Sequence, residues 1–160
     1  IIGCLVSASA FVLVMIVAML VTPRPPSTLG FGLAALVVAI LFLHHGRDPQ
    51  RAVLPGFVLG LIPLACALCA NQIHVCGPDG CSSLCMPACT AGGLIAGLGV
   101  ARVATRRGAG LSFWLAASGL ALLTGSMGCA CIGFSGVVGL GAGYVVGILP
   151  EALRSTWRSA

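Results

Sequence analysis

Long apolar stretches separated by short polar segments run the whole length of this chain. A helix of about 20 apolar residues crosses the ~30 Å hydrocarbon core of a bilayer, and most of the stretches have about that length. The uncharged stretch from Leu111 to Leu149 is too long for one crossing, so we expect two helices with a turn in the glycine-rich segment 125–131. The pattern predicts six transmembrane helices, at about 1–21, 29–45, 53–74, 83–104, 111–127 and 132–149.

Proline and glycine mark the connections between these stretches. Three prolines lie between Thr22 and Thr28, where they should end the first helix. Pro78, Asp79 and Gly80 form a strong turn signal between the third and fourth stretches. The fold class that follows is all-α, a polytopic membrane bundle in which residues 1–160 form a single domain.

Composition excludes a soluble domain. Hydrophobic residues make up 59% of the chain and charged residues 7%, against about 25% charged residues in an ordinary soluble domain. Three acidic and eight basic residues could not cover the surface of a soluble protein of this size. The net charge of +5 is spread over connections between apolar stretches, so it does not indicate a nucleic-acid partner. The expected location is a bacterial inner membrane, with the lipid bilayer as the main partner.

Arginine clusters predict the orientation of the helices. Cytoplasmic loops of membrane proteins are enriched in Lys and Arg, and all eight basic residues here are Arg. With the clusters inside, the connections 22–28, 74–82 and 125–135 lie outside and both chain ends lie in the cytoplasm. The clusters are Arg47 and Arg51; Arg102, Arg106 and Arg107; and Arg154 and Arg158.

Glycines recur at every fourth position on three of the predicted helices. Small residues at this spacing let the backbones of membrane helices approach closely. Packing inside one bundle is the favoured explanation, and a homo-oligomer joined through these faces is the alternative. The residues are Gly56 and Gly60; Gly93 and Gly97; and Gly139, Gly143 and Gly147.

Eight of the nine cysteines map to the outer half of the predicted bundle. Folding the chain about the turn at Pro78 matches three pairs in depth, which are Cys76 with Cys81, Cys69 with Cys85, and Cys66 with Cys89. The remaining outer pair, Cys129 and Cys131, is too closely spaced for an easy internal disulfide and should pair outward or exchange thiols.

Three interpretations of these thiols remain open. In an oxidising compartment paired thiols become disulfides, and Cys76, Cys81, Cys129 and Cys131 are the candidates for a disulfide or a sensing role. Alternatively, four thiolates could bind a soft metal ion of the zinc, copper or mercury class tetrahedrally, without any other cofactor. Some cysteines could also be small buried residues only. The candidate metal ligands are Cys66, Cys69, Cys85 and Cys89.

The topology and two cysteine positions resemble a known family, the six-helix bacterial membrane anti-sigma factors of the negative-regulator-of-sigma-F type. That family has two outer cysteines at a spacing like that of Cys81 and Cys131, which are 50 residues apart, and a basic inner loop where this chain has Arg102 to Arg107. The family usually has His-Cys-Pro at the second cysteine, whereas this chain has Ala130-Cys131-Ile132. The resemblance implies a cytoplasmic sigma factor as partner, bound by a segment that we expect before Ile1.

These observations favour a non-enzymatic membrane regulator or sensor whose outer cysteines respond to metal or oxidant, with an anti-sigma factor as its specific form. A thiol-based protein that binds or transports a soft metal is the first alternative. The second is a disulfide-stapled structural subunit of a membrane complex.

Overall fold

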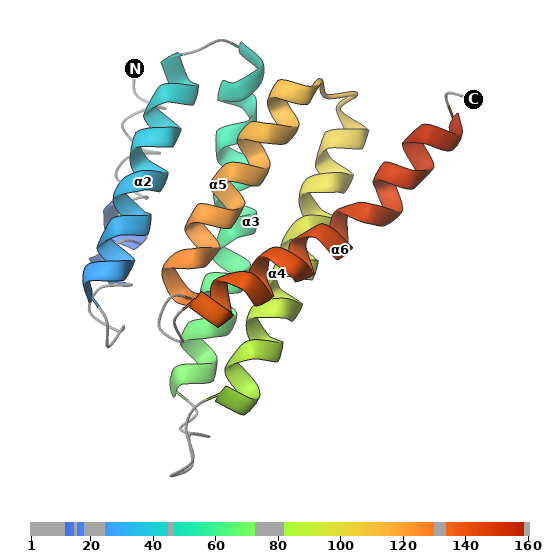
Figure 1. Cartoon of the computed structure of the whole chain (residues 1–160). Helices are drawn as coiled ribbons and strands as arrows, with labels where there is room; N and C mark the ends of the chain where they lie inside the picture. Colours follow the sequence, from blue (N-terminus) through green and yellow to red (C-terminus); the bar gives the residue numbers. More distant parts are fainter. Residues whose placement is uncertain are drawn as a thin grey trace.

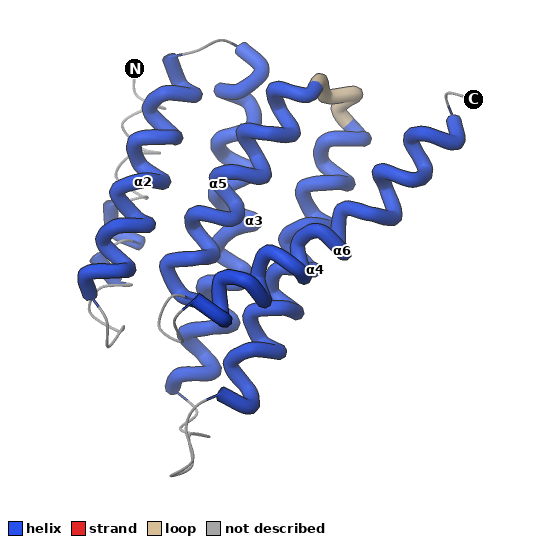
Figure 2. Tube along the Cα trace, viewed as in Figure 1, coloured by secondary structure: helices blue, strands red, loops and turns tan. Residues whose placement is uncertain are grey.

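The computed structural model describes residues 12–14, 16–17, 25–44, 47–72, 82–129 and 134–158. Within these ranges the chain forms helices and no strand (Figure 1 and Figure 2), which confirms the all-α prediction for the described part. The five labelled helices are α2 (Pro25–His44), α3 (Arg47–Gln72), α4 (Ser82–Arg106), α5 (Leu111–Cys129) and α6 (Phe134–Arg158).

Four segments of these helices are long and apolar enough to cross a membrane, and they indicate a membrane protein. A fifth apolar segment, Leu29–His44 in α2, is shorter. The predicted first span, 1–21, lies largely outside the described residues. The four long segments are Gln50–Ala70, Met86–Arg106, Leu111–Cys129 and Phe134–Glu151.

The predicted turn at 125–131 is wrong in its first part, because α5 continues as a helix to Cys129. The glycines there serve close packing and do not break the helix. A Cβ on Gly125 would lie 2.8 Å from Cγ of Pro63, and one on Gly128 would lie 2.9 Å from Cδ1 of Leu64. A glycine run inside a membrane helix therefore allows α5 to approach α3.

Two closely packed helix pairs make up most of the bundle. In the first pair, α3 lies against α5 through Gly56 and Gly60. A Cβ on Gly56 would lie 2.8 Å from the carbonyl oxygen of Ala117, and one on Gly60 would lie 2.7 Å from Cβ of Thr124. Real Cβ atoms do not come so near, so only glycine permits this separation of the two backbones.

In the second pair, α4 lies against α6 with glycines on both sides, and this is the most extensive helix contact in the described bundle. Gly93 and Gly97 of α4 face the backbone of Leu140 and Tyr144 in α6. In return, Gly143 and Gly147 of α6 face the backbone of Thr90 and Leu94 in α4. The prediction that these glycines pack inside the bundle is confirmed.

The two pairs meet along an interface that we call the seam and define as the contacts of α3 and α5 with α4 and α6. Buried residues of all four helices pack along it, among them Ala52, Ala96, Phe113 and Tyr144. Side-chain hydrogen bonds also join the two pairs. The hydroxyl of Tyr144 in α6 donates to Oγ of Ser118 in α5 at 2.8 Å. Nη1 of Arg107, just after α4, donates to the carbonyl oxygen of Arg51 in α3 at 3.3 Å. The two pairs are thus packed closely both internally and against each other.

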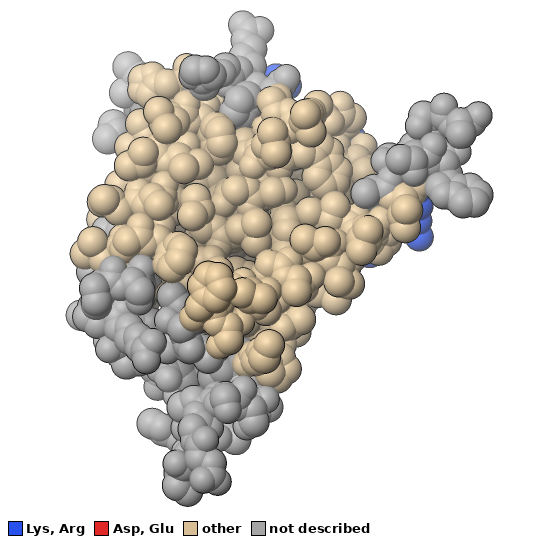
Figure 3. Space-filling model, viewed as in Figure 1, with Lys and Arg blue, Asp and Glu red and all other residues tan. Residues whose placement is uncertain are grey.

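The three arginine clusters lie at one end of the bundle, within the part of the chain that the structure describes. The start of α3, the connection between α4 and α5 and the end of α6 all lie at the top of Figure 1. Arg107 contacts Arg51 there, and Arg106 and Arg154 line one cavity. On the face seen in Figure 3, basic side chains appear only at the upper edge and near the end of α6. The three clusters predicted to share one side of the membrane are therefore together.

Adding a methyl group to Gly143 should destabilise the protein, because the new Cβ would collide with the backbone of Thr90. Overpacking of this kind typically costs about 1–3 kcal/mol. We expect Gly143→Ala to lower the midpoint of thermal unfolding in detergent, measured by circular dichroism. Gly141→Ala, two residues away on the same helix, has open space around its Cβ and should leave the midpoint unchanged or higher. Equal midpoints for the two variants would contradict the packing described here.

Candidate functional site: a buried pair of thiols

At the end of the bundle opposite the arginines, two cysteines from different helices meet. Cys89 lies in the second turn of α4 and Cys129 is the last residue of α5. Both side chains are fully buried. They share an apolar cluster with Ala67 of α3 and Leu140 of α6, so four helices enclose the two thiols.

The two thiols are in direct contact through a side-chain hydrogen bond between Cys89 and Cys129. Both cysteines are present as thiols, as are Cys66 and Cys69. Because Cys89 belongs to the α4/α6 pair and Cys129 to the α3/α5 pair, their contact crosses the seam.

Glycines next to the two cysteines explain why their sulfur atoms come together. Gly128 precedes Cys129 and brings this end of α5 against Leu64 and Ala67 of α3. Gly92 follows Cys89 by three positions and packs on Pro63 of α3, with its Cβ position 2.7 Å from the proline Cα. The glycines thus hold α4 and α5 close to the same turns of α3, and this brings the thiols of Cys89 and Cys129 together.

The other predicted thiols are placed differently. Cys66 is half-buried and Cys69 is exposed on α3, and the α3 residue that joins the buried cluster is Ala67. The contact that the structure shows for Cys89 is with Cys129, and the pairing of Cys89 with Cys66 stays a prediction. Three predicted candidates lie outside the described residues, and the side chain of a fourth, Cys85, does so as well; the four are Cys76, Cys81, Cys85 and Cys131.

No group of three or more metal-ligating side chains occurs within the part of the chain that the structure describes. The proposed four-thiolate site needs Cys85, whose side chain is outside that part, so this site stays a prediction. Two facing thiols could still bind a soft metal ion with low coordination number, because thiolate is the side-chain ligand such ions prefer.

Two adjacent thiols can also be oxidised to a disulfide. In that reaction the two thiols lose two protons and two electrons, and one molecule of hydrogen peroxide accepts them and becomes two molecules of water. One sulfur attacks a peroxide oxygen to give a sulfenic acid and water, and the second sulfur displaces a second water as the S–S bond forms. The sulfurs must approach to about 2.05 Å in the product, so oxidation would draw α4 and α5 together at this end of the seam.

Comparisons with protein-family models, with curated proteins and with solved structures find no match for this chain. The chemistry of the site is therefore argued from its own residues.

Oxidation should link Cys89 to Cys129. We propose a chain in which every other cysteine is replaced by serine, treated with copper phenanthroline in detergent. Trypsin can then cut at the exposed Arg106 and Arg107, between α4 and α5. The two halves of the chain should stay joined on a non-reducing gel and separate on reduction, because the new bond spans the cut.

The matched control adds Cys129→Ser to the same chain, and its halves should separate without reductant. A second chain that keeps Cys66 in place of Cys129 tests the pairing expected from the sequence. The trypsin cut cannot reveal a bond between Cys66 and Cys89, because both residues precede it. The disulfide of this second chain is therefore measured by mass spectrometry. Failure of Cys89 and Cys129 to join would contradict the contact.

Proposed function

We propose that this protein is a non-enzymatic membrane sensor in which Cys89 and Cys129 respond to oxidant. The observation that carries the proposal is their direct contact across the seam. A thiol pair inside one helix pair would change little on oxidation, whereas a bond across the seam changes how the two pairs are joined. Local thiol chemistry of this kind can bias an element with two arrangements.

The seam offers a route from the thiols to the arginine end. The Cys89–Cys129 contact lies at one end, the Tyr144–Ser118 hydrogen bond lies between, and the cavity that contains Trp114 lies at the other. Because each helix pair is close-packed through glycine, it should move as a unit. Closing the seam at the thiol end would then rock the pairs about the Tyr144 contact and open the cavity.

The orientation in the membrane is part of the proposal. We place the thiol end on the outer side of a bacterial inner membrane and the arginine end in the cytoplasm, because basic residues accumulate on the cytoplasmic side. The full arrangement has six spans with both chain ends inside. An oxidant outside the cell would then be detected by thiols, and the change would appear at the cytoplasmic end.

The regulated partner in this proposal is a cytoplasmic sigma factor, bound by a cytoplasmic segment of the protein. Its support is the resemblance to the six-helix anti-sigma factors in the spacing of Cys81 and Cys131 and in the basic segment from Arg102 to Arg107. The cavity at the arginine end is where a change in the bundle would reach such a segment.

Soft-metal binding is the second candidate, and the same two facing thiols favour it. Two-thiolate binding of a copper(I) or mercury(II) ion would also bridge the seam, because both sulfurs would bind one ion. A permanent disulfide would instead fit a stapled structural subunit. The response of the protein to oxidant and to metal separates these functions.

Oxidation at the thiol end should change the surroundings of Trp114 at the arginine end. Trp157→Phe leaves Trp114 as the single tryptophan, and every cysteine but Cys89 and Cys129 is replaced by serine. Addition of hydrogen peroxide to this chain in nanodiscs should raise the quenching of Trp114 fluorescence by aqueous acrylamide, because the cavity opens. Reductant should reverse the change.

Adding Cys129→Ser to this chain provides the control and should abolish the peroxide response. An unchanged or lower quenching constant, with the disulfide shown to be complete by mass spectrometry, would overturn the sensor proposal. A response to mercury(II) without a response to peroxide would assign the site to metal binding instead.

A further inference from the structure

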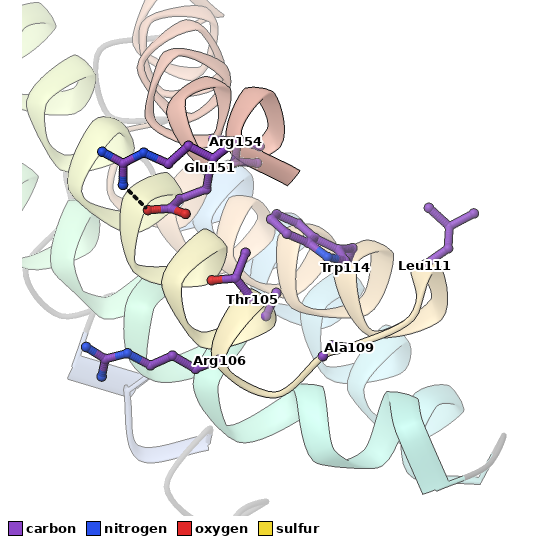
Figure 4. A pocket seen from close by; sticks show the side chains of 10 residues that line it. Thr105, Arg106, Ala109, Leu111, Trp114, Glu151 and Arg154 are labelled. Carbon is purple, nitrogen blue, oxygen red and sulfur yellow. Dashed lines mark hydrogen bonds and ion pairs between the residues drawn. The ribbon is translucent and has the colours of Figure 1, made fainter. Parts of the chain in front are cut away.

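The arginine end of the bundle contains a cavity of about 850 Å³ between the connection of α4 with α5 and the last turns of α6 (Figure 4). Its volume is within the range of about 300–1,000 Å³ that is usual for small-molecule sites. Most of its wall is apolar and comes from three helices and one connection. The apolar residues are Ala104, Ala109, Leu111, Trp114 and Ile148.

The backbone at the end of α4 shapes this cavity. Gly108 has a positive φ of 57°, a conformation that glycine adopts without strain. The N–H of Gly108 donates to the carbonyl oxygen of Thr105 at 3.2 Å, and that of Ala109 donates to Ala104 at 3.0 Å. This pair of bonds is a Schellman cap. It turns the chain sharply, so that the end of α4 and the start of α5 present small side chains and Trp114 to the cavity.

The polar part of the wall carries two arginines and one carboxylate. Nη1 of Arg154 lies 3.1 Å from Oε1 of Glu151, and this ion pair leaves 71% of the Arg154 side chain exposed. Arg106, on α4, is exposed and has no ion-pair or hydrogen-bond partner within the described chain. In Figure 4 the side chains of Arg106 and Arg154 extend in the same direction, while Trp114 and Leu111 lie at the other end of the cavity. Glu151 opposes an anion, but Arg154 already neutralises it.

By contrast, Arg107 is engaged elsewhere. It donates to the carbonyl oxygen of Arg51 and lies over the ring of Phe113, with 5.9 Å between its Cζ and the ring centroid. Its role is to join α4 to α3 and α5. Arg106 and Arg154 are therefore the basic side chains available to a ligand of the cavity.

We infer that this cavity binds an anionic phospholipid, with its phosphate at Arg106 and Arg154 and the upper part of an acyl chain against Trp114 and Leu111. Arginine binds phosphate through two parallel N–H groups. Basic pockets between membrane helices at the cytoplasmic surface recognise anionic headgroups, and tryptophan is favoured at the level of the headgroups. Arg106, unpaired within the described chain, and the exposed, ion-paired Arg154 beside an apolar wall at one end of a membrane bundle fit a lipid better than a free phosphate ion.

Trp114 makes the binding measurable. We propose the Trp157→Phe chain in nanodiscs of phosphatidylcholine that contain a minor fraction of phosphatidylglycerol, with bromine on the acyl chains of one lipid or the other. Brominated phosphatidylglycerol should quench Trp114 fluorescence more than brominated phosphatidylcholine does at the same mole fraction. A basic residue near the surface favours an anionic lipid by about fivefold, and we expect a preference of about that size for each arginine that contacts the phosphate.

Arg106→Gln and Arg154→Gln should each reduce the preference, and the double variant should remove it. The matched control is Arg102→Gln, which removes an exposed arginine one turn earlier on α4 that does not line the cavity. This control should keep the preference. Circular dichroism of each variant confirms that the helices are retained.

Equal quenching by the two brominated lipids would overturn the inference. So would a preference that survives the double arginine variant, or one that Arg102→Gln removes equally, since each would reflect the general charge of this end. A Trp114 that neither lipid quenches would also contradict the inference, because no acyl chain would then lie against it. None of these outcomes depends on the thiols, so the lipid experiment tests the cavity independently of the proposed sensor function.

Discussion

Close approach of helix backbones through glycine is the constraint on which the rest of this structure depends. Lipid tails are as apolar as leucine, so membrane helices gain little from hydrophobic contact with each other and associate through packing and hydrogen bonds. Gly93 and Gly97 on α4 meet Gly143 and Gly147 on α6, while Gly56 and Gly60 bring α3 against α5. These contacts define two helix pairs, and the contacts between the pairs define the seam.

The two thiols can affect the bundle as a whole because they lie on opposite sides of the seam. Cys89 belongs to the α4/α6 pair and Cys129 to the α3/α5 pair, so their contact crosses the seam. The Tyr144–Ser118 hydrogen bond crosses it as well. At the arginine end, Arg107 joins α4 to α3. A chemical change at the thiols therefore affects how the two helix pairs are positioned against each other. The cavity at Arg106 and Arg154 lies at the opposite end of the same interface.

Much of this arrangement could be predicted from the sequence, because apolar length and glycine spacing follow directly from the bilayer. The helices, the gathering of arginines at one end and the packing role of Gly93 and Gly143 were all expected. The predicted turn at 125–131 is wrong in its first part, because Gly125 and Gly128 lie inside α5 and pack against Pro63 and Leu64. A glycine run in a sequence is compatible with a turn and with a closely packed helix. Only the position of the neighbouring helix distinguishes the two.

The thiol contact shows a different limit of sequence reasoning. Matching depths about the turn at Pro78 paired Cys89 with Cys66, because a hairpin brings adjacent helices together. Depth alone gives no rotation about a helix axis, and in the fold Cys89 faces Cys129 of α5 while Ala67 takes the α3 position in that cluster. The depth of Cys129 at the end of its apolar stretch was the one available signal for this contact. Similarly, the cavity arises from the cap at Gly108 and from the course of α6, and no residue pattern predicted it.

The sensor proposal depends on its proposed orientation, with the thiol end toward the outside of the cell and the arginine cavity toward the cytoplasm. Labelling of single cysteines in intact cells with a membrane-impermeant maleimide tests it most directly, in a chain whose native cysteines are all replaced by serine. Ser135→Cys, exposed at the start of α6, should be labelled in intact cells. Gly110→Cys, exposed between α4 and α5, should be labelled only after the membrane is permeabilised. Labelling of Gly110→Cys in intact cells, with Ser135→Cys protected, would contradict the account.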